Sequence, residues 1–202
     1  MKDIIHSDWF VLSGYAIGVV GLILSYVFFK KSKIEKRPCC INRSNNLIYK
    51  SHNRLSNLKI SATYKGVDVE TLSYTKVAFW NAGKATITNT DLSTIDPLRI
   101  EIDSEIIYEC EILYTSHKAN GFNLDWSKDN KTVYLKFDYL DFGQGVVIKI
   151  IHSGNTASYT SSAVKINGAI KGATKIESPH PSFSPTNFLM DSKIFYEDSI
   201  LI

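Results

Sequence analysis

The sequence has few of the residues that build catalytic and metal sites. Its 202 residues include three cysteines and five histidines. It contains no His-Glu-x-x-His, Cys-x-x-Cys or Gly-x-Ser-x-Gly motif and no glycine-rich phosphate loop. Cys39, Cys40 and Cys110 do not form the pattern of a disulfide framework, and the adjacent pair lacks the spacing of zinc ligands. We therefore expect a protein that is not an enzyme and needs no cofactor or metal.

Three residues deserve a catalytic interpretation before they are set aside. Asp138 and Asp141 lie close together near a predicted turn, where solvated loop acids are the expected outcome. His152 ends a predicted buried strand. A histidine there could contact a ligand, but we expect it to cap the end of the strand. An enzyme assembled from scattered residues stays open as a third function class, because catalytic sites do not require a sequence motif.

Charge is missing from one long stretch near the start of the chain. Residues 9–29 are 21 consecutive residues without charge or proline. As a helix they would span about 31 Å, close to the thickness of the hydrocarbon core of a bilayer. A cleaved signal peptide would be shorter and would carry its positive charge in front. The sequence therefore predicts a transmembrane helix over residues 9–29.

Positive charge gathers directly behind this run. Residues 1–8 carry one lysine against two aspartates. The membrane-flanking cations that follow the run are Lys30, Lys31, Lys33, Lys36 and Arg37. Because the positive flank stays in the cytoplasm, we expect the N-terminus (residues 1–8) outside a bacterial inner membrane and the rest of the chain in the cytoplasm. Contact with membrane lipid follows from this placement, and the cluster acts as a stop-transfer signal rather than a specific lipid site.

Small residues form one stripe along the predicted helix. They follow one another at spacings of four, three and four, and are Gly14, Gly18, Gly21 and Ser25. Such a stripe lets two helices approach closely, so it predicts a homo-oligomer. Glycine is also common in membrane helices, and a chance match is the alternative. The absence of ionisable groups within the span argues against a proton relay or ion pathway.

The chain after the anchor divides into three parts. Residues 30–56 are polar and predict a basic, irregular juxtamembrane linker. Residues 57–176 alternate between apolar and polar side chains, the period of half-buried strands. Residues 177–202 predict a link rich in proline and serine and an apolar tail, which we expect to dock on its own domain. The net charge of +3 lies mostly in the juxtamembrane cluster and gives no support for a nucleic-acid partner.

The predicted strands are short and separated by turn signals. Residues 72–80 and the dense apolar run 146–151 predict strands, the second buried on both faces. Ile106, Tyr108, Cys110, Ile112 and Tyr114 are expected to share one face of a long strand. Eight or so strands without an amphipathic helix favour a mainly β fold, an antiparallel β-sandwich that is Ig-like or related.

One set of segments has a distinctive appearance. These segments are residues 77–83 with Ile87 and Asp91, residues 96–100, residues 137–140 and residues 151–154. Together they resemble uncharacterised bacterial single-pass membrane proteins with a cytosolic β-sandwich domain. The resemblance covers residues 57–173, and its motifs are rich in turns rather than catalytic groups. It implies the fold and leaves the activity open.

Two function classes fit these features best. The first is a membrane-anchored, non-enzymatic binding module whose sandwich takes a protein encoded by a neighbouring gene, or a small ligand. The second is a membrane-perturbing effector in bacterial antiphage defence, with a sandwich that senses a cytosolic signal such as a nucleotide second messenger. Signal-dependent membrane leakage would separate the second class from the first.

Overall fold

The computed structural model describes residues 8–49, 62–102, 105–154 and 164–178. The chain divides into two compact units, Met1–Ile34 and Glu35–Ile202. The predictions for residues 1–7, for the strand residues 57–61 and for the tail beyond residue 178 lie outside the described residues.

The first unit contains helix α1, Asp8–Ser32. Its segment Leu12–Phe29 is long and apolar enough to cross a membrane, and none of that segment is buried within the structure. Large apolar side chains along the helix are exposed, including Leu22 and Phe29. A helix that is apolar on all sides and covered on none is typical of a segment that lies in lipid.

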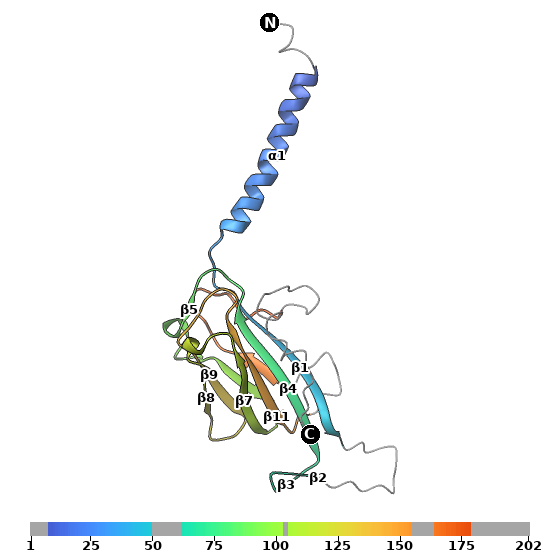
Figure 1. The fold of residues 1–202 in the computed structure, drawn as a ribbon, viewed down its shortest axis with the longest axis vertical. Coiled ribbons are helices and arrows are strands. Elements are labelled where there is room, and N and C mark those ends of the chain that lie inside the picture. Colours follow the sequence, from blue (N-terminus) through green and yellow to red (C-terminus); the bar gives the residue numbers. More distant parts are fainter. Residues whose placement is uncertain (1–7, 50–61, 103–104, 155–163, 179–202) are drawn as a thin grey trace. The chain divides into compact units, whose positions relative to one another are not determined.

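The second unit is built from two antiparallel sheets of four strands each (Figure 1). The first sheet has the order β1 (Pro38–Tyr49), β4 (Thr71–Asn81), β11 (Gly145–His152) and β7 (Ile107–Thr115). The second has the order β12 (Val164–Asn167), β6 (Arg99–Ile102), β9 (Thr132–Lys136) and β8 (Asn123–Trp126). The mainly β fold predicted from the sequence is therefore confirmed.

Smaller elements complete the described part of the unit. β2 (Ala62–Tyr64) pairs with β3 (Val67–Val69), and β5 (Ile87–Thr88) pairs with β10 (Tyr139–Leu140). Two single-turn 3₁₀ helices, η1 (Asn89–Asp91) and η2 (Lys118–Asn120), lie in the connections. The two-residue strands β5 and β10 are too short to produce an alternating pattern, and the sequence did not predict them.

One apolar core joins the two sheets. The ring of Phe79 in β4 packs near the ring of Phe137, the residue after β9, and the two ring centroids lie 6.2 Å apart. Val146, Ile148 and Ile150 of β11 are fully buried in the same core. Val147, on the opposite face of β11, is also fully buried. The predicted burial on both faces therefore holds for Val146, Val147 and Ile148, whereas Lys149 and Ile151, on the same face as Val147, are only half-buried.

Strand β7 does not keep the single apolar face that its sequence predicts. The register between β11 and β7 shifts once between Val147 and Ile148 and again between Ile151 and His152. Each shift is a β-bulge, which adds a residue and reverses which side chains face the core. Cys110 and Ile112 pack on the core between the sheets, whereas Tyr114 packs on the apolar cluster of the other face. Ile107 replaces the exposed Ile106 in the core.

The predicted linker over residues 30–56 is wrong in its central part. Pro38–Tyr49 forms β1, an edge strand that pairs with β4 over its whole length. Its polar side chains suit this place because they hydrogen-bond to neighbouring strands. The Asn42 Nδ2 donates to the Val164 carbonyl at 3.0 Å, and the Ser44 and Thr75 hydroxyls lie 2.7 Å apart. Because many side chains of β1 are polar, this strand lacks the hydrophobic alternation by which strands are predicted from sequence.

Candidate functional site

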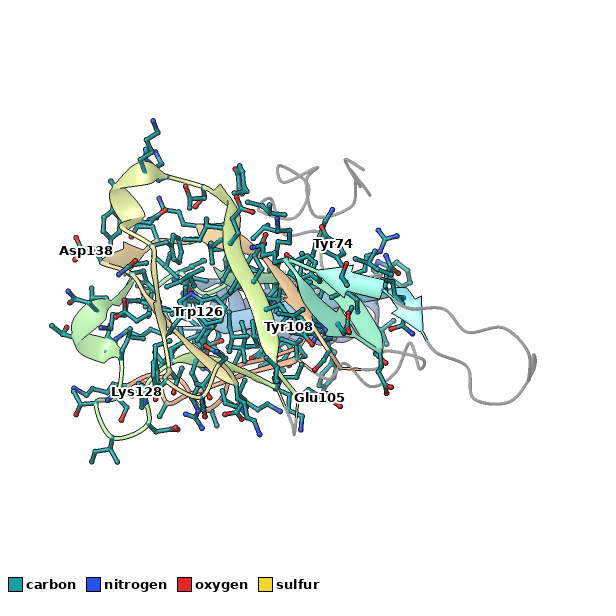
Figure 2. The ribbon with its side chains drawn as sticks, turned by 90° about the horizontal axis from the view of Figure 1, so that it is seen from below. Tyr74, Glu105, Tyr108, Trp126, Lys128 and Asp138 are labelled. Atoms are coloured by element: carbon teal, nitrogen blue, oxygen red, sulfur yellow. The ribbon has the colours of Figure 1, made fainter. Side chains whose placement is uncertain are left out.

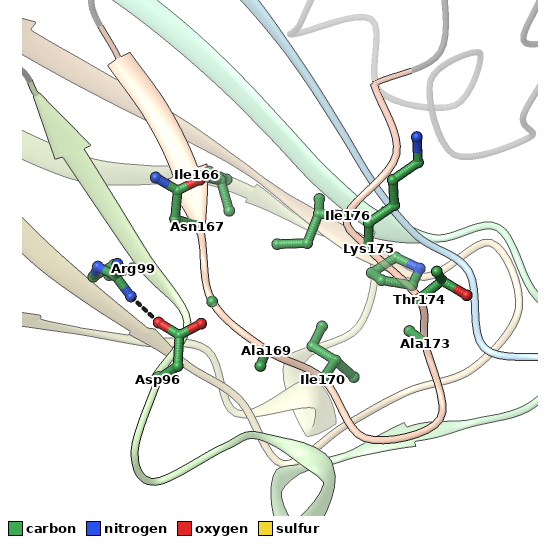
Figure 3. Close-up of a pocket in the computed structure, with 12 residues that line it drawn as sticks. Asp96, Arg99, Ile166, Asn167, Ala169, Ile170, Ala173, Thr174, Lys175 and Ile176 are labelled. Carbon is green, nitrogen blue, oxygen red and sulfur yellow. Dashed lines mark hydrogen bonds and ion pairs between the residues drawn. The ribbon is translucent and has the colours of Figure 1, made fainter.

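A cavity of about 540 Å³ lies at the sandwich edge where β12 ends (Figure 3). Residues 166–170 form one wall and residues 173–176 with Pro38 form the other. Asp96 and Arg99, at the start of β6, close a third side. Its volume falls within the usual range for ligand sites, roughly 300–1,000 Å³.

Gly168 gives the first wall its course. Its φ is +137°, a conformation that side-chain-bearing residues rarely adopt. A Cβ at this position would lie 2.6 Å from the Leu98 Cα, so only glycine lets the chain pass so close to β6. Beyond it, the Ala169 N–H donates to the Asp96 carbonyl at 3.0 Å, and Ile170 bridges to Leu92. The wall is therefore fixed by backbone contacts.

The second wall is held against the start of β1. The Glu177 N–H donates to the Pro38 carbonyl at 2.9 Å, and the Glu177 carbonyl accepts from the Cys40 N–H at 2.8 Å. The Glu177 carboxylate also pairs with the Arg37 guanidinium at 2.8 Å. Two segments distant in sequence thus hold the second wall in place.

The electrostatics of the cavity are close to neutral. The Arg99 guanidinium pairs with Asp96 at 2.5 Å and with Glu101 at 2.9 Å. The hydrogen bond that Arg99 donates to the Asp96 carboxylate is the main reason that the Arg99 pKa is raised, and its bond to Glu101 comes next. Apolar side chains, among them Ile170 and Ile176, make up the middle of the cavity (Figure 3). The site suits an uncharged ligand that carries both polar and apolar groups.

A second cavity of about 680 Å³ lies near η1 and β9. Its walls include Leu92, Pro97, Leu98 and Phe137, and they are more apolar than those of the first cavity. The second cavity is larger, but only the first borders β12, the edge strand of its sheet, where backbone groups can also take part in binding.

The residues of the small stripe lie on α1 as predicted. A Cβ added to Gly14, Gly18 or Gly21 would meet no atom within 4 Å, and Ser25 is exposed. The stripe therefore has room for a neighbouring helix.

The membrane-flanking cations separate into two groups. Lys30 and Lys31 belong to α1, and Lys33 follows it. Lys36 and Arg37 instead form ion pairs within the second unit: Lys36 Nζ lies 2.6 Å from the Asp91 carboxylate, and Arg37 pairs with Glu177. The sequence could not show that these two charges are engaged by the sandwich.

The candidate catalytic residues do not come together. His152 is fully buried, with its Nε2 2.8 Å from the Thr75 hydroxyl, while its Nδ1 accepts from the Gly154 N–H at 3.0 Å. Burial lowers the pKa of His152 to about 4. Asp141 is exposed and accepts from the Thr86 hydroxyl at 2.6 Å, and Asp138 is exposed beyond β9 (Figure 2). Among the described residues, no group of three or more metal-ligating side chains occurs.

The cavity itself was missed by sequence reasoning. Its walls come from segments 96–99 and 166–176, which carry no binding motif and meet only in the fold. Gly168 was the available signal, because a glycine directly after a strand often marks a close backbone approach.

Comparison with known proteins adds no relative. No protein-family model matches this chain, and no curated protein matches it. The arguments for function therefore depend on the geometry of the molecule.

Proposed function

We propose that the protein is a membrane-anchored, non-enzymatic binding module. α1 anchors the chain, and the lysines behind it place the sandwich on the cytoplasmic side of a bacterial inner membrane. The cavity at the end of β12 binds the ligand, and the helix stripe pairs copies of the protein in the bilayer.

The observation that carries this proposal is the lining of the cavity. It combines an apolar middle with an arginine already paired to two carboxylates. Specific binding sites typically combine apolar surface with a few placed polar groups. The described lining holds no nucleophile paired with a base, which favours binding over catalysis.

The same lining does not favour a nucleotide sensor. A nucleotide phosphate needs an available cation or a cluster of backbone N–H groups. Arg99 is neutralised by Asp96 and Glu101, and Lys175 extends away from the centre of the cavity (Figure 3). No specific observation therefore supports the effector alternative.

Site-specific photo-crosslinking in native membranes tests the proposal. A photoreactive residue replaces Thr174, which is exposed and lines the cavity, in the full-length protein. The matched control carries it at Lys128, which is exposed on the turn after β8 (Figure 2). We expect a discrete adduct from position 174 that is lost when Ala173→Phe fills the cavity. Identical adducts from both positions, or none from position 174, would contradict the proposal.

A further inference from the structure

We propose that this cavity binds an extended segment of a partner protein, which adds to β12 as a further strand. The inference depends on the proposed binding function and names the chemistry of the ligand. It rests on the direction of the backbone groups along β6 and β12.

The hydrogen bonds of β6 fix this direction. The Leu98 carbonyl accepts from the Leu135 N–H at 3.0 Å, and the Ile102 N–H donates to the Lys131 carbonyl at 3.2 Å. Even-numbered residues of β6 therefore point their backbone groups toward β9. In an antiparallel sheet the intervening residues point the other way. The backbone groups of Arg99 and Glu101 thus point toward β12, where these residues pair with Asn167 and Lys165.

By the same alternation, every second residue of β12 points its backbone N–H and C=O away from β6. Ile166 lies opposite Ile100, so its N–H and C=O point away from β6. Val164 has the same parity, and its carbonyl accepts from the Asn42 side chain, which lies on the side away from β6. Within the described part of the chain, no residue hydrogen-bonds to the outward N–H and C=O of Ile166. These groups lie at the wall of the cavity.

An outward donor and acceptor on one residue match an extended peptide backbone. One residue of an added strand can exchange both hydrogen bonds with Ile166, as in other cases of strand addition. Unsatisfied edge groups are ready templates for such pairing. The Asn42 side chain already occupies the Val164 carbonyl, which ends the available edge on one side, so the site is short.

The rest of the cavity sets the side chains that fit. Successive side chains of a strand point to opposite faces, so alternate residues of the peptide enter the cavity. The cavity offers them contact with Ile170, Ala173 and Ile176. The ion pair of Arg99 with Asp96, which has no net charge, lies beside these residues. The expected ligand is an extended segment whose alternate residues are uncharged and apolar.

The experiment starts from a random heptapeptide library displayed on phage. It is selected against the full-length protein in lipid nanodiscs, and the best peptide is synthesised with a fluorescent label. We expect at least tenfold weaker binding to Ala173→Phe, which fills the cavity. The matched control, Ala119→Phe, places the same side chain at an exposed position of η2 and should bind as the wild type does.

Backbone methylation of the peptide separates strand addition from other binding. Methylation of the one N–H that faces Ile166 should abolish binding, whereas methylation of either neighbouring N–H should not. The amide exchange of Ile166 should slow at least tenfold in the complex. No selected binder, unchanged binding to Ala173→Phe, or equal tolerance of methylation at every position would each overturn the inference. A cavity-dependent crosslink from position 174 together with such a failure would retain the binding function and reject the peptide.

Discussion

His152 couples the stability of the sandwich to pH. The folded protein holds its buried ring neutral, with a pKa of about 4 against the ordinary 6.5. The unfolded chain therefore binds the proton more readily, and stability falls as the pH drops from about 6.5 toward 4. The full shift corresponds to roughly 3 kcal/mol. Chemical unfolding of the full-length protein in micelles at pH 7 and pH 4.5 measures this loss.

The matched variant is His152→Gln, which keeps a polar group at this site but does not titrate. We expect it to be less stable than the wild type at pH 7, because the contacts to Thr75 and Gly154 change. Its stability should depend less on pH between 6.5 and 4. Equal pH slopes in the two proteins would show that another group is responsible.

At the scale of elements, Glu109 attaches the β2–β3 hairpin to β7. Its Oε2 accepts from the Tyr64 hydroxyl at 2.7 Å and from Lys65 at 2.6 Å, while its Oε1 pairs with Lys149 at 2.9 Å. The hydrogen bond from Lys65 is the main cause that lowers the Glu109 pKa to about 2. The carboxylate therefore links the hairpin to β7, beside the contact between the Tyr64 and Tyr108 rings, whose centroids lie 5.8 Å apart.

We predict that Glu109→Gln loosens the hairpin without unfolding the sandwich. The change removes the negative charge that holds two cations, so amide exchange in β2 and β3 should become several-fold faster. Glu111→Gln is the control, because Glu111 is more exposed and pairs with Lys149 rather than with the hairpin. Similar exchange in both variants would contradict the role given to Glu109. Hydrogen exchange read by mass spectrometry provides the measurement.

Elements also show how far sequence alone could go. β4 and β11 were predictable because burial leaves a strong apolar signal in each. β1 was not, because its asparagines and serines hydrogen-bond to neighbouring strands and imitate a loop. The faces of β7 were wrong because a bulge leaves no trace in alternation. The cavity was beyond reach, since an outward N–H at Ile166 depends on pairing between distant strands.

At the scale of the whole molecule, the helix stripe predicts association in the membrane. Gly14→Ile with Gly18→Ile should block close approach and lower the dimer fraction by several-fold. Ala16→Ile is the control, because it adds similar bulk outside the stripe. Energy transfer between labelled copies in bilayers measures association. Unchanged transfer in the double variant would exclude the stripe as the interface.

The orientation of the chain is tested with a thiol at Lys128. We expect Lys128→Cys to react with a membrane-impermeant maleimide only after the cells are opened. The native thiols give little background, because Cys39 is buried and burial raises the pKa of both half-buried thiols, Cys40 and Cys110, that of Cys110 to about 12. Labelling in intact cells would contradict the proposed topology and place the sandwich outside the cytoplasm.

The pairing of β4 with β11 also has a consequence for synthesis. Residues 82–144 separate the two strands, so β4 leaves the ribosome long before its partner exists. Four consecutive side chains of β4 are buried in the folded protein: Val77, Ala78, Phe79 and Trp80. They stay exposed on the nascent chain until β11 has been synthesised. Such distant pairing slows folding and invites aggregation of nascent chains. Chains that stop before Gly145 should therefore engage chaperones for longer than complete ones.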